Sequence, residues 1–198
     1  YDQPEECICF INVSKGDTNS YAYRHDTTYR HYKYTLDMPY PGDYGWLCQT
    51  WQPASKKPVE CLVLSTFAVE AESLVDVRII GALERTFTNK AGVAVKDVKV
   101  IAMQSSDPRT KGVLDISSLN PQVLNHIANF FTHSAEVSGC KDCKVVRHLN
   151  SKEALGVVQA SHKDYQREFA DTTIYNAPNL WCLPWSKEAS QGPGKERV

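Results

Sequence analysis

The chain has 198 residues, of which 42% are hydrophobic, and a formal net charge of -1. This length and apolar content suffice for one sizeable core and do not require a second domain. The charge is too small to indicate binding to nucleic acid or to an anionic membrane, and no apolar run is long enough to span a bilayer. We therefore expect one soluble domain.

The first hundred residues alternate short apolar runs with turn-forming residues. The runs occupy residues 8–13, 62–64, 75–80 and 98–103, and the turns lie at 16–17, 41–42 and 89–92. Runs of this length between turns are typical of β-strands, and the pattern lacks the regular alternation of strands and helices found in Rossmann folds. The sequence therefore predicts a small β-barrel or a strongly curled sheet.

Two helices follow the predicted strands. Asn120 is a suitable N-cap and Pro121 suits the first turn of the first helix. Its apolar stripe consists of Val123, Leu124, Ile127, Phe130 and Phe131. The second helix begins with the capping-box pair Asn150 and Glu153, and its stripe consists of Ala154, Leu155, Val158, His162, Tyr165 and Phe169. We expect both helices to pack on the barrel, with His162 as a packing residue rather than a ligand.

Seven cysteines, an odd number in a chain that can form a full core, indicate reduced thiols and a reducing compartment. Two pairs, Cys7 with Cys9 and Cys140 with Cys143, are weak candidates for a zinc site, because four thiolates brought together would ligate zinc. The alternative is that Cys7 and Cys9 pack as small hydrophobic side chains at the start of the first strand. The pattern favours this second interpretation.

A series of short motifs occurs in a fixed order along the chain. The motifs are Tyr40-Pro41-Gly42-Asp43-Tyr44-Gly45-Trp46, residues 55–64, 77–83 and 97–103, Asp107-Pro108-Arg109, Asp115-Ile116 and residues 126–133. In content and order they resemble the soluble family I inorganic pyrophosphatases over roughly residues 8–166. The resemblance implies an α+β, mainly β fold, a five-stranded OB-like barrel with two packed α-helices. It assigns residues 1–170 to this domain and 171–198 to a partly irregular C-terminal extension.

The same resemblance implies hydrolysis of pyrophosphate with several Mg²⁺ ions clamped by carboxylates, because Mg²⁺ prefers oxygen ligands in octahedral geometry. The three acidic positions of the family's D-x-D-P-x-D segment hold Ser55, Lys57 and Glu60 in this chain. The fourth acidic position is interpreted as Gly92, inside an expanded loop at residues 85–96, and Asp97 matches the fifth. We therefore expect a degraded metal site, with Glu60 and Asp97 as its remnants.

Lys57 is expected to weaken Mg²⁺ binding more than the loss of a carboxylate ligand alone would. An ammonium in place of a carboxylate removes a metal ligand and adds a positive charge close to the divalent cation. At about 4 Å and an effective dielectric constant near 20, each unit of charge contributes about 4 kcal/mol. We expect Mg²⁺ binding to collapse, and we expect the ammonium to pair with Glu60 and Asp97 in place of the missing metal.

Several of the phosphate-binding positions implied by the resemblance are also substituted. Tyr40, Tyr44 and Lys99 match the family. The substituted positions hold Asn12, Ser20, Ala22, Ser134 and Ala135. The family's phosphate-binding Arg falls near Tyr32, and Arg30 or Lys33 takes that place if the local alignment is shifted. Structural roles remain open for the matched residues: the two tyrosines would pin their turn to the barrel, and Asp97 with Lys99 would form an ion pair on one strand face.

Two functions of different classes follow from this pattern. The favoured one is a catalytically inactive member of the family that serves as a structural or accessory subunit of a larger assembly, without a cofactor. Its partners would be other protein subunits or further copies of the chain, with the 85–96 loop and the 171–198 extension as docking surfaces. Because the chain begins with Tyr1 and eukaryotic relatives include organelle forms, the mitochondrion is the expected compartment and the cytoplasm the alternative.

The alternative is an active Mg²⁺-dependent inorganic diphosphatase that uses substitute ligands. Its candidate acids are Glu60, Asp97, Asp43, Asp107 and Asp115. A third hypothesis is a phosphate-containing ligand bound without turnover, with Lys57, Lys99, Tyr40 and Tyr44 as contacts.

Overall fold

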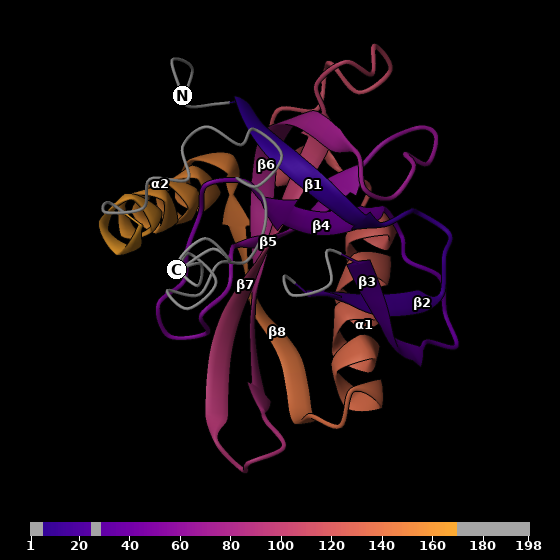
Figure 1. Ribbon diagram of the computed structural model, residues 1–198. Helices are drawn as coiled ribbons and strands as arrows, with labels where there is room; N and C mark the ends of the chain where they lie inside the picture. The colour runs from indigo at the N-terminus through magenta and orange to yellow at the C-terminus, as the bar shows by residue number, and fades with distance from the viewer. Residues whose placement is uncertain (1–5, 25–28, 170–198) are drawn as a thin grey trace, which may run out of the picture.

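The computed structural model describes residues 6–24 and 29–169 (Figure 1). The strands are β1 (Glu6–Val13), β2 (Asn19–Arg24), β3 (Tyr29–Thr35), β4 (Asp43–Leu47), β5 (Glu60–Leu64), β6 (Leu74–Thr88), β7 (Ala94–Gln104) and β8 (Lys141–Asn150). The helices are α1 (Pro121–Val137), α2 (Ser151–Glu168) and the short 3₁₀ helix η1 (Ile116–Ser118). The C-terminal extension expected at 171–198 lies outside the described residues.

Five strands close into a ring. Their order is β1-β4-β5-β7-β6, and the pairing of β1 with β6 completes the barrel. The pair β5–β7 is parallel, and the other neighbours in the ring are antiparallel. β8 pairs with the second half of β6, while β2 and β3 form a separate hairpin on the α1 side of the barrel (Figure 1). The predicted five-stranded barrel with two helices is confirmed.

Two apolar clusters lie on opposite faces of the strands. The barrel interior is filled from all five ring strands, for example by Ile11, Leu47 and Val63, and is joined by Ala154 and Val158 of α2. The outer cluster lies between β5, β6, β7 and α1. Its fully buried members include Leu62, Ile80, Leu83, Ile101, Ile127 and Phe130. Burying each of these side chains contributes about 1.5–3 kcal/mol, so the outer cluster fixes α1 against the barrel.

The helix caps form as predicted. Asn120 accepts a hydrogen bond from the Gln122 backbone N–H at 2.8 Å, and Asn150 and Glu153 form a reciprocal capping box. His162 is half-buried on α2, and its Nδ1 donates to the carbonyl oxygen of Gln49 at 2.8 Å. This contact agrees with a packing role. None of the helices in the described part of the chain has the length and apolar character needed to cross a membrane.

The prediction of an expanded loop at residues 85–96 is wrong. β6 continues to Thr88 and β7 begins at Ala94, so most of this segment belongs to two long paired strands. Asn89 closes the turn between them by accepting backbone hydrogen bonds from Ala91 and Val93, each at 3.0 Å. The β-branched and aromatic residues that flank Asn89 favour extended backbone, which is why the segment forms a hairpin rather than a loop.

The same hairpin changes the expected geometry of the site. Gly92, interpreted as the fourth acidic position, lies exposed in the turn with φ of +76°. Arg85, expected in the loop, is instead a strand residue directly opposite Asp97. The hairpin therefore places the guanidinium of Arg85 beside the carboxylate of Asp97.

Gly45 is required by the close approach of β4 to β1. A Cβ atom at this position would lie 1.7 Å from the carbonyl oxygen of Phe10, which is part of the paired strand and cannot move away alone. We predict that Gly45→Ala lowers the free energy of unfolding by about 3 kcal/mol or more, a cost typical of overpacking in a core. Urea denaturation followed by circular dichroism measures this change.

Gly156 provides the matched control. It lies exposed inside α2, and a Cβ atom there has no neighbour within 4 Å. Gly156→Ala should raise stability by about 0.5–1 kcal/mol, because alanine favours helix more than glycine does. Equal effects of the two substitutions would contradict this account of the β1–β4 contact.

Candidate functional site

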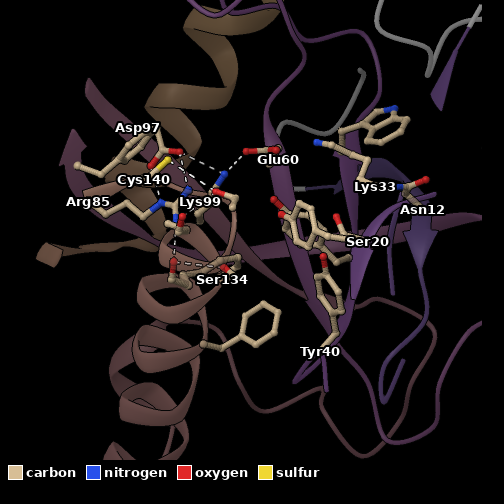
Figure 2. Close-up of a pocket in the computed structure, with 18 of the residues that line it drawn as sticks. Asn12, Ser20, Lys33, Tyr40, Glu60, Arg85, Asp97, Lys99, Ser134 and Cys140 are labelled. Carbon is tan, nitrogen blue, oxygen red and sulfur yellow. Dashed lines mark hydrogen bonds and ion pairs between the residues drawn. The ribbon is translucent and has the colours of Figure 1, made fainter. Parts of the chain in front are cut away.

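A cavity of about 220 Å³ opens between α1, the β2–β3 hairpin and the adjoining faces of β5, β6 and β7. Figure 2 shows Arg85, Asp97, Lys99 and Ser134 along one side and Asn12, Ser20, Lys33 and Tyr40 along the other, with Glu60 between them. Acidic, basic and hydroxyl groups therefore face a shared space. This is the candidate functional site.

Glu60, the first residue of β5, is held by two ammonium groups. Its Oε2 accepts a hydrogen bond from Lys57 Nζ at 3.0 Å and a second, short one from Lys99 Nζ. Burial alone would raise the pKa of Glu60, but the charges of Lys99 and Lys57 outweigh burial and hold this pKa well below its ordinary value. Glu60 is therefore ionised at neutral pH, with its Oε2 paired to both ammonium groups. The predicted pairing of Lys57 with Glu60 is confirmed.

Asp97, on β7, is held mainly by Arg85. The guanidinium binds both carboxylate oxygens, with Nε–Oδ1 at 2.7 Å and Nη2–Oδ2 at 2.9 Å. Lys99 Nζ lies 3.2 Å from Oδ2, so the ion pair between Asp97 and Lys99 considered from the strand pattern is present. Burial opposes ionisation, yet Lys99 and Arg85 together lower the pKa of Asp97. Lys57, expected to reach Asp97 as well, forms its ion pair with Glu60 instead.

Arg85 also ties the site to α1. Its Nη1 donates to the carbonyl oxygen of Phe131 at 2.6 Å, and its side chain is only 8% exposed. Sequence reasoning missed this residue because the segment was interpreted as a loop. The pairing register of the β6–β7 hairpin, which places Arg85 across from Asp97, is the signal that would have found it.

The charged form of Lys99 is destabilised by this arrangement. It is 3% exposed and lies among Arg85, Lys57 and the two acids. Burial, followed by the positive charges of Arg85 and Lys57, lowers its pKa, while Glu60 and Asp97 oppose this effect. Burial is therefore the main reason that the charged form of Lys99 is disfavoured.

The residues present do not fit a Mg²⁺ cluster. Within residues 6–24 and 29–169, no group of three or more Asp, Glu, His or Cys side chains is arranged to hold a metal ion. The two acids that face the cavity are already bonded to fixed cations. Magnesium sites use several oxygen ligands, so binding here would require Glu60 or Asp97 to leave its present partners.

The other acids proposed as substitute ligands act elsewhere. Asp43 is buried and accepts hydrogen bonds from backbone N–H groups of Lys15 and Val69. Asp107 accepts from Thr66 and Arg109, and Asp115 accepts from Ser117 and Ser151. All three serve as anchors for loops or helix starts and do not line the cavity.

The two matched tyrosines line the cavity and also pack. Tyr40 lies 4.7 Å from the ring of Phe130 and Tyr44 lies 5.8 Å from that of Phe131, measured between centroids. Burial raises the pKa of Tyr40 to about 12 and that of Tyr44 well above its ordinary value. Both hydroxyls are therefore protonated hydrogen-bond donors at neutral pH. Tyr40 and Tyr44 therefore pack their turn against α1 and also line the cavity.

Most of the substituted positions also face the cavity. Asn12, Ser20, Ser134 and Ala135 line it, as does Lys33. Ala22 is not among the lining residues, and Ser55 lies exposed in a turn where it contacts Gln52. Arg30, the other residue considered for phosphate binding, points to the Asn12 carbonyl oxygen and to Glu72. Lys33 is therefore the basic residue that β3 contributes.

The weak zinc prediction is wrong. Cys7 and Cys9 lie in the barrel interior, whereas Cys143 packs near Phe131 and Cys140 lines the cavity. Burial raises the pKa of Cys7 to about 11, which disfavours the thiolate that zinc requires. Cys48 is disulfide-bonded, so the expectation of reduced thiols fails at that position.

Comparisons with known proteins agree with the barrel topology. Residues 9–166 match the family model for inorganic pyrophosphatase. Inorganic pyrophosphatase of Thermus thermophilus is 32% identical over 169 residues, covering 82% of this chain and 92% of that protein. Soluble inorganic pyrophosphatase 2 of Chlamydomonas reinhardtii is 28% identical, covering 88% of each chain. The crystal structure of the Thermus thermophilus protein superposes with a TM-score of 0.75 at 30% identity, covering 84% of this chain and 94% of the other.

The Arg85–Asp97 pair generates a stability prediction. Arg85→Met retains volume but leaves a largely buried carboxylate without its bidentate partner, so we expect a loss of about 3–5 kcal/mol in the free energy of unfolding. Lys96→Met is the control on the same hairpin, because Lys96 is 63% exposed and pairs with Glu84 at the surface. Its loss should stay below about 1 kcal/mol. Chemical denaturation measures both, and similar losses would contradict the assigned role of Arg85.

The lowered pKa values of Glu60 and Asp97 predict acid sensitivity. A carboxylate whose pKa is lower in the folded than in the unfolded state contributes stability that is present above the unfolded value and is lost as pH falls through the folded value. The unfolded values are near 4.5 for Glu60 and 3.8 for Asp97, so stability should fall as pH decreases below about 4.5. Glu60→Gln should flatten that fall in denaturation curves between pH 7 and pH 3. An unchanged slope would contradict the pairing described for Glu60.

Proposed function

The chain belongs to the inorganic pyrophosphatase family, and from that premise we propose that it is a member in which fixed cations have replaced the catalytic metal ions, so that it does not hydrolyse pyrophosphate. One observation carries the proposal. The two carboxylates of the cavity, Glu60 and Asp97, are each already bonded to side-chain cations.

Charge explains why these cations exclude Mg²⁺. A metal ion bound by both acids would lie within a few ångströms of Lys57, Lys99 and Arg85. Each of these positive charges opposes the ion by about 4 kcal/mol at about 4 Å and an effective dielectric constant near 20. Lys57 is partly exposed and can swing away, but Lys99 and Arg85 are buried and held by further contacts. The site therefore disfavours the ion at its centre.

A non-catalytic member of an enzyme family acts through what its fold presents to other molecules. We propose an accessory role in an assembly with other protein subunits or with further copies of the chain. Ile8 and Leu74, 39% and 52% exposed on the paired strands β1 and β6, support a contact surface there. The mitochondrion is the compartment we propose for this assembly, because organelle forms occur among eukaryotic members of the family.

The second candidate is an active Mg²⁺-dependent inorganic diphosphatase, and the comparisons favour it. The relatives reported above are named inorganic pyrophosphatases, and the alignment with the Thermus thermophilus protein covers 92% of its length. The cavity also keeps the family-matched residues Tyr40, Tyr44, Glu60, Asp97 and Lys99. For this activity Glu60 would have to exchange its lysine partners for metal ions when substrate binds.

Phosphate release from pyrophosphate distinguishes the two candidates. We predict background release by the purified chain at saturating substrate and millimolar Mg²⁺, with folding verified by circular dichroism. Release above background that disappears in Asp97→Asn would contradict the proposal and establish the second candidate.

A charge-reversal variant tests the stated cause. Lys57→Asp returns a carboxylate to the cavity and should increase Mg²⁺ affinity at least tenfold in calorimetry. Lys56→Asp makes the same charge change at an exposed neighbour that does not line the cavity and should leave affinity unchanged. Equal gains in both variants would mean that Lys57 has no special role.

A further inference from the structure

Cys48 differs from the other cysteines in the described part of the chain. The chain contains seven cysteines. Cys48 is disulfide-bonded, and five others carry free thiols, namely Cys7, Cys9, Cys61, Cys140 and Cys143. The seventh is Cys182, which lies in the C-terminal segment outside the described residues. Within a single chain, Cys182 is therefore the remaining partner for Cys48.

The path of the chain allows this bond. The described residues end at Phe169, whose ring packs against that of Trp51 with 5.2 Å between centroids. Trp51 follows Cys48 by three residues, which separates their Cα atoms by at most about 11 Å. The 13 residues from Phe169 to Cys182 can span about 45 Å when extended. The C-terminal segment therefore starts near Cys48 and is long enough to reach it.

The barrel holds Cys48 in a fixed position. Its backbone N–H donates to the carbonyl oxygen of Ile8 on β1 at 2.9 Å. The following turn is held by Thr50, whose Oγ1 donates to the Leu47 carbonyl oxygen at 2.7 Å and accepts from the Val59 backbone N–H at 3.0 Å. A segment bonded to Cys48 is therefore attached to the barrel wall.

Cys48 belongs to an apolar cluster on the outer face of the barrel. Cys9 and Ile11 of β1 point into the barrel interior. Phe10 lies between them and points outward, because successive side chains of a strand alternate between its faces. Phe10 stacks on Trp46 of the paired strand β4, with 5.1 Å between ring centroids, and Cys48 completes the cluster.

This outer cluster is covered. Phe10 is 9% exposed and Cys48 4%, whereas Ile8, the next residue on the same face of β1, is 39% exposed. In the described part of the chain, neither α1 nor α2 shares an apolar cluster with Phe10. The residues beside Cys182 are apolar, namely Leu180, Trp181, Leu183 and Trp185. They have the chemistry that a cover for Phe10 and Trp46 requires.

We propose that a disulfide between Cys48 and Cys182 fastens residues 170–198 over Phe10 and Trp46, and that this bond is a redox-sensitive clasp. It forms when the two thiols give two electrons and two protons to a small disulfide such as oxidised glutathione, which leaves as two thiols. Reduction by a dithiol reverses the step: the dithiol becomes a cyclic disulfide, and both cysteines regain their hydrogens.

Opening the clasp changes the surface that the barrel presents. Phe10 is paired with Leu74 across β1 and β6, and Ile8 and Leu74 are already exposed on this face. Uncovering Phe10 and Trp46 therefore enlarges one continuous apolar contact surface. The inference holds whether or not the chain hydrolyses pyrophosphate, because it uses neither the carboxylates nor the cations of the cavity.

Peptide mapping without reduction tests the bond. The full chain is equilibrated with oxidised glutathione, its remaining thiols are alkylated, and it is digested with trypsin. Cleavage after lysine and arginine places Cys48 in the peptide 34–56 and Cys182 in the peptide 168–187. We expect these two peptides to be joined, in a chain that is monomeric by mass under denaturing conditions. Two separate alkylated peptides, another partner for Cys48, or a link found only in a covalent dimer would overturn the inference.

Binding of the hydrophobic dye anilinonaphthalenesulfonate tests whether the bond controls the cover. Reduction of the oxidised chain with dithiothreitol should raise dye fluorescence at least threefold, and Cys182→Ser should show the raised value without reductant. Cys140→Ser is the matched control, because it removes a partly exposed free thiol and should behave like the unaltered chain. Circular dichroism verifies that each form is folded. Equal fluorescence of the oxidised and reduced chains, or equal effects of the two variants, would overturn the role of the bond as a clasp.

Discussion

The structure of the site depends on the compensation of two carboxylates by three side-chain cations. Glu60 and Asp97 lie in a partly buried space where an unpaired negative charge would be costly. Lys57, Lys99 and Arg85 remove that cost, and each comes from a different part of the chain: a turn before β5, the strand β7 and the strand β6. Arg85 extends the compensation to α1 through the Phe131 carbonyl oxygen. The barrel, the long hairpin and the first helix are thus joined at one set of charges.

Fixed cations and bound metal ions neutralise the same carboxylates with different consequences. A metal ion is exchangeable, keeps open coordination positions and activates water, all of which hydrolysis of pyrophosphate needs. An ammonium or guanidinium is covalently part of the chain and offers only hydrogen-bond donors. A site built from such groups keeps its cations at any Mg²⁺ concentration, but it has no means of activating water through a metal. This chemical difference, rather than a change of fold, separates the proposed function from that of the named relatives.

Local sequence patterns predicted much of the fold. The apolar runs on β1, β5, β6 and β7, the Asn120 cap and the capping box at Asn150 all depend on residues close together in the chain, and all are found. The pairing of Lys57 with Glu60 was predictable for the same reason, since the two residues are three positions apart. The role of Arg85 was not predictable in this way, because it depends on the register of two long strands that were interpreted as a loop. The sequence left zinc as the less favoured interpretation of the two cysteine pairs, because proximity in space of Cys7 and Cys140 cannot be derived from spacing within each pair.

Binding of Mn²⁺, observed by electron paramagnetic resonance, tests the central claim most directly. Hexaaqua Mn²⁺ gives a sharp signal that is lost when the ion binds to protein carboxylates, and Mn²⁺ occupies the same oxygen-ligand sites as Mg²⁺. If fixed cations have replaced the metal ions, the signal of micromolar Mn²⁺ remains unchanged when the chain is added in excess. Stoichiometric loss of that signal, reversed by Asp97→Asn, would show that the two carboxylates still hold a metal and would contradict the account.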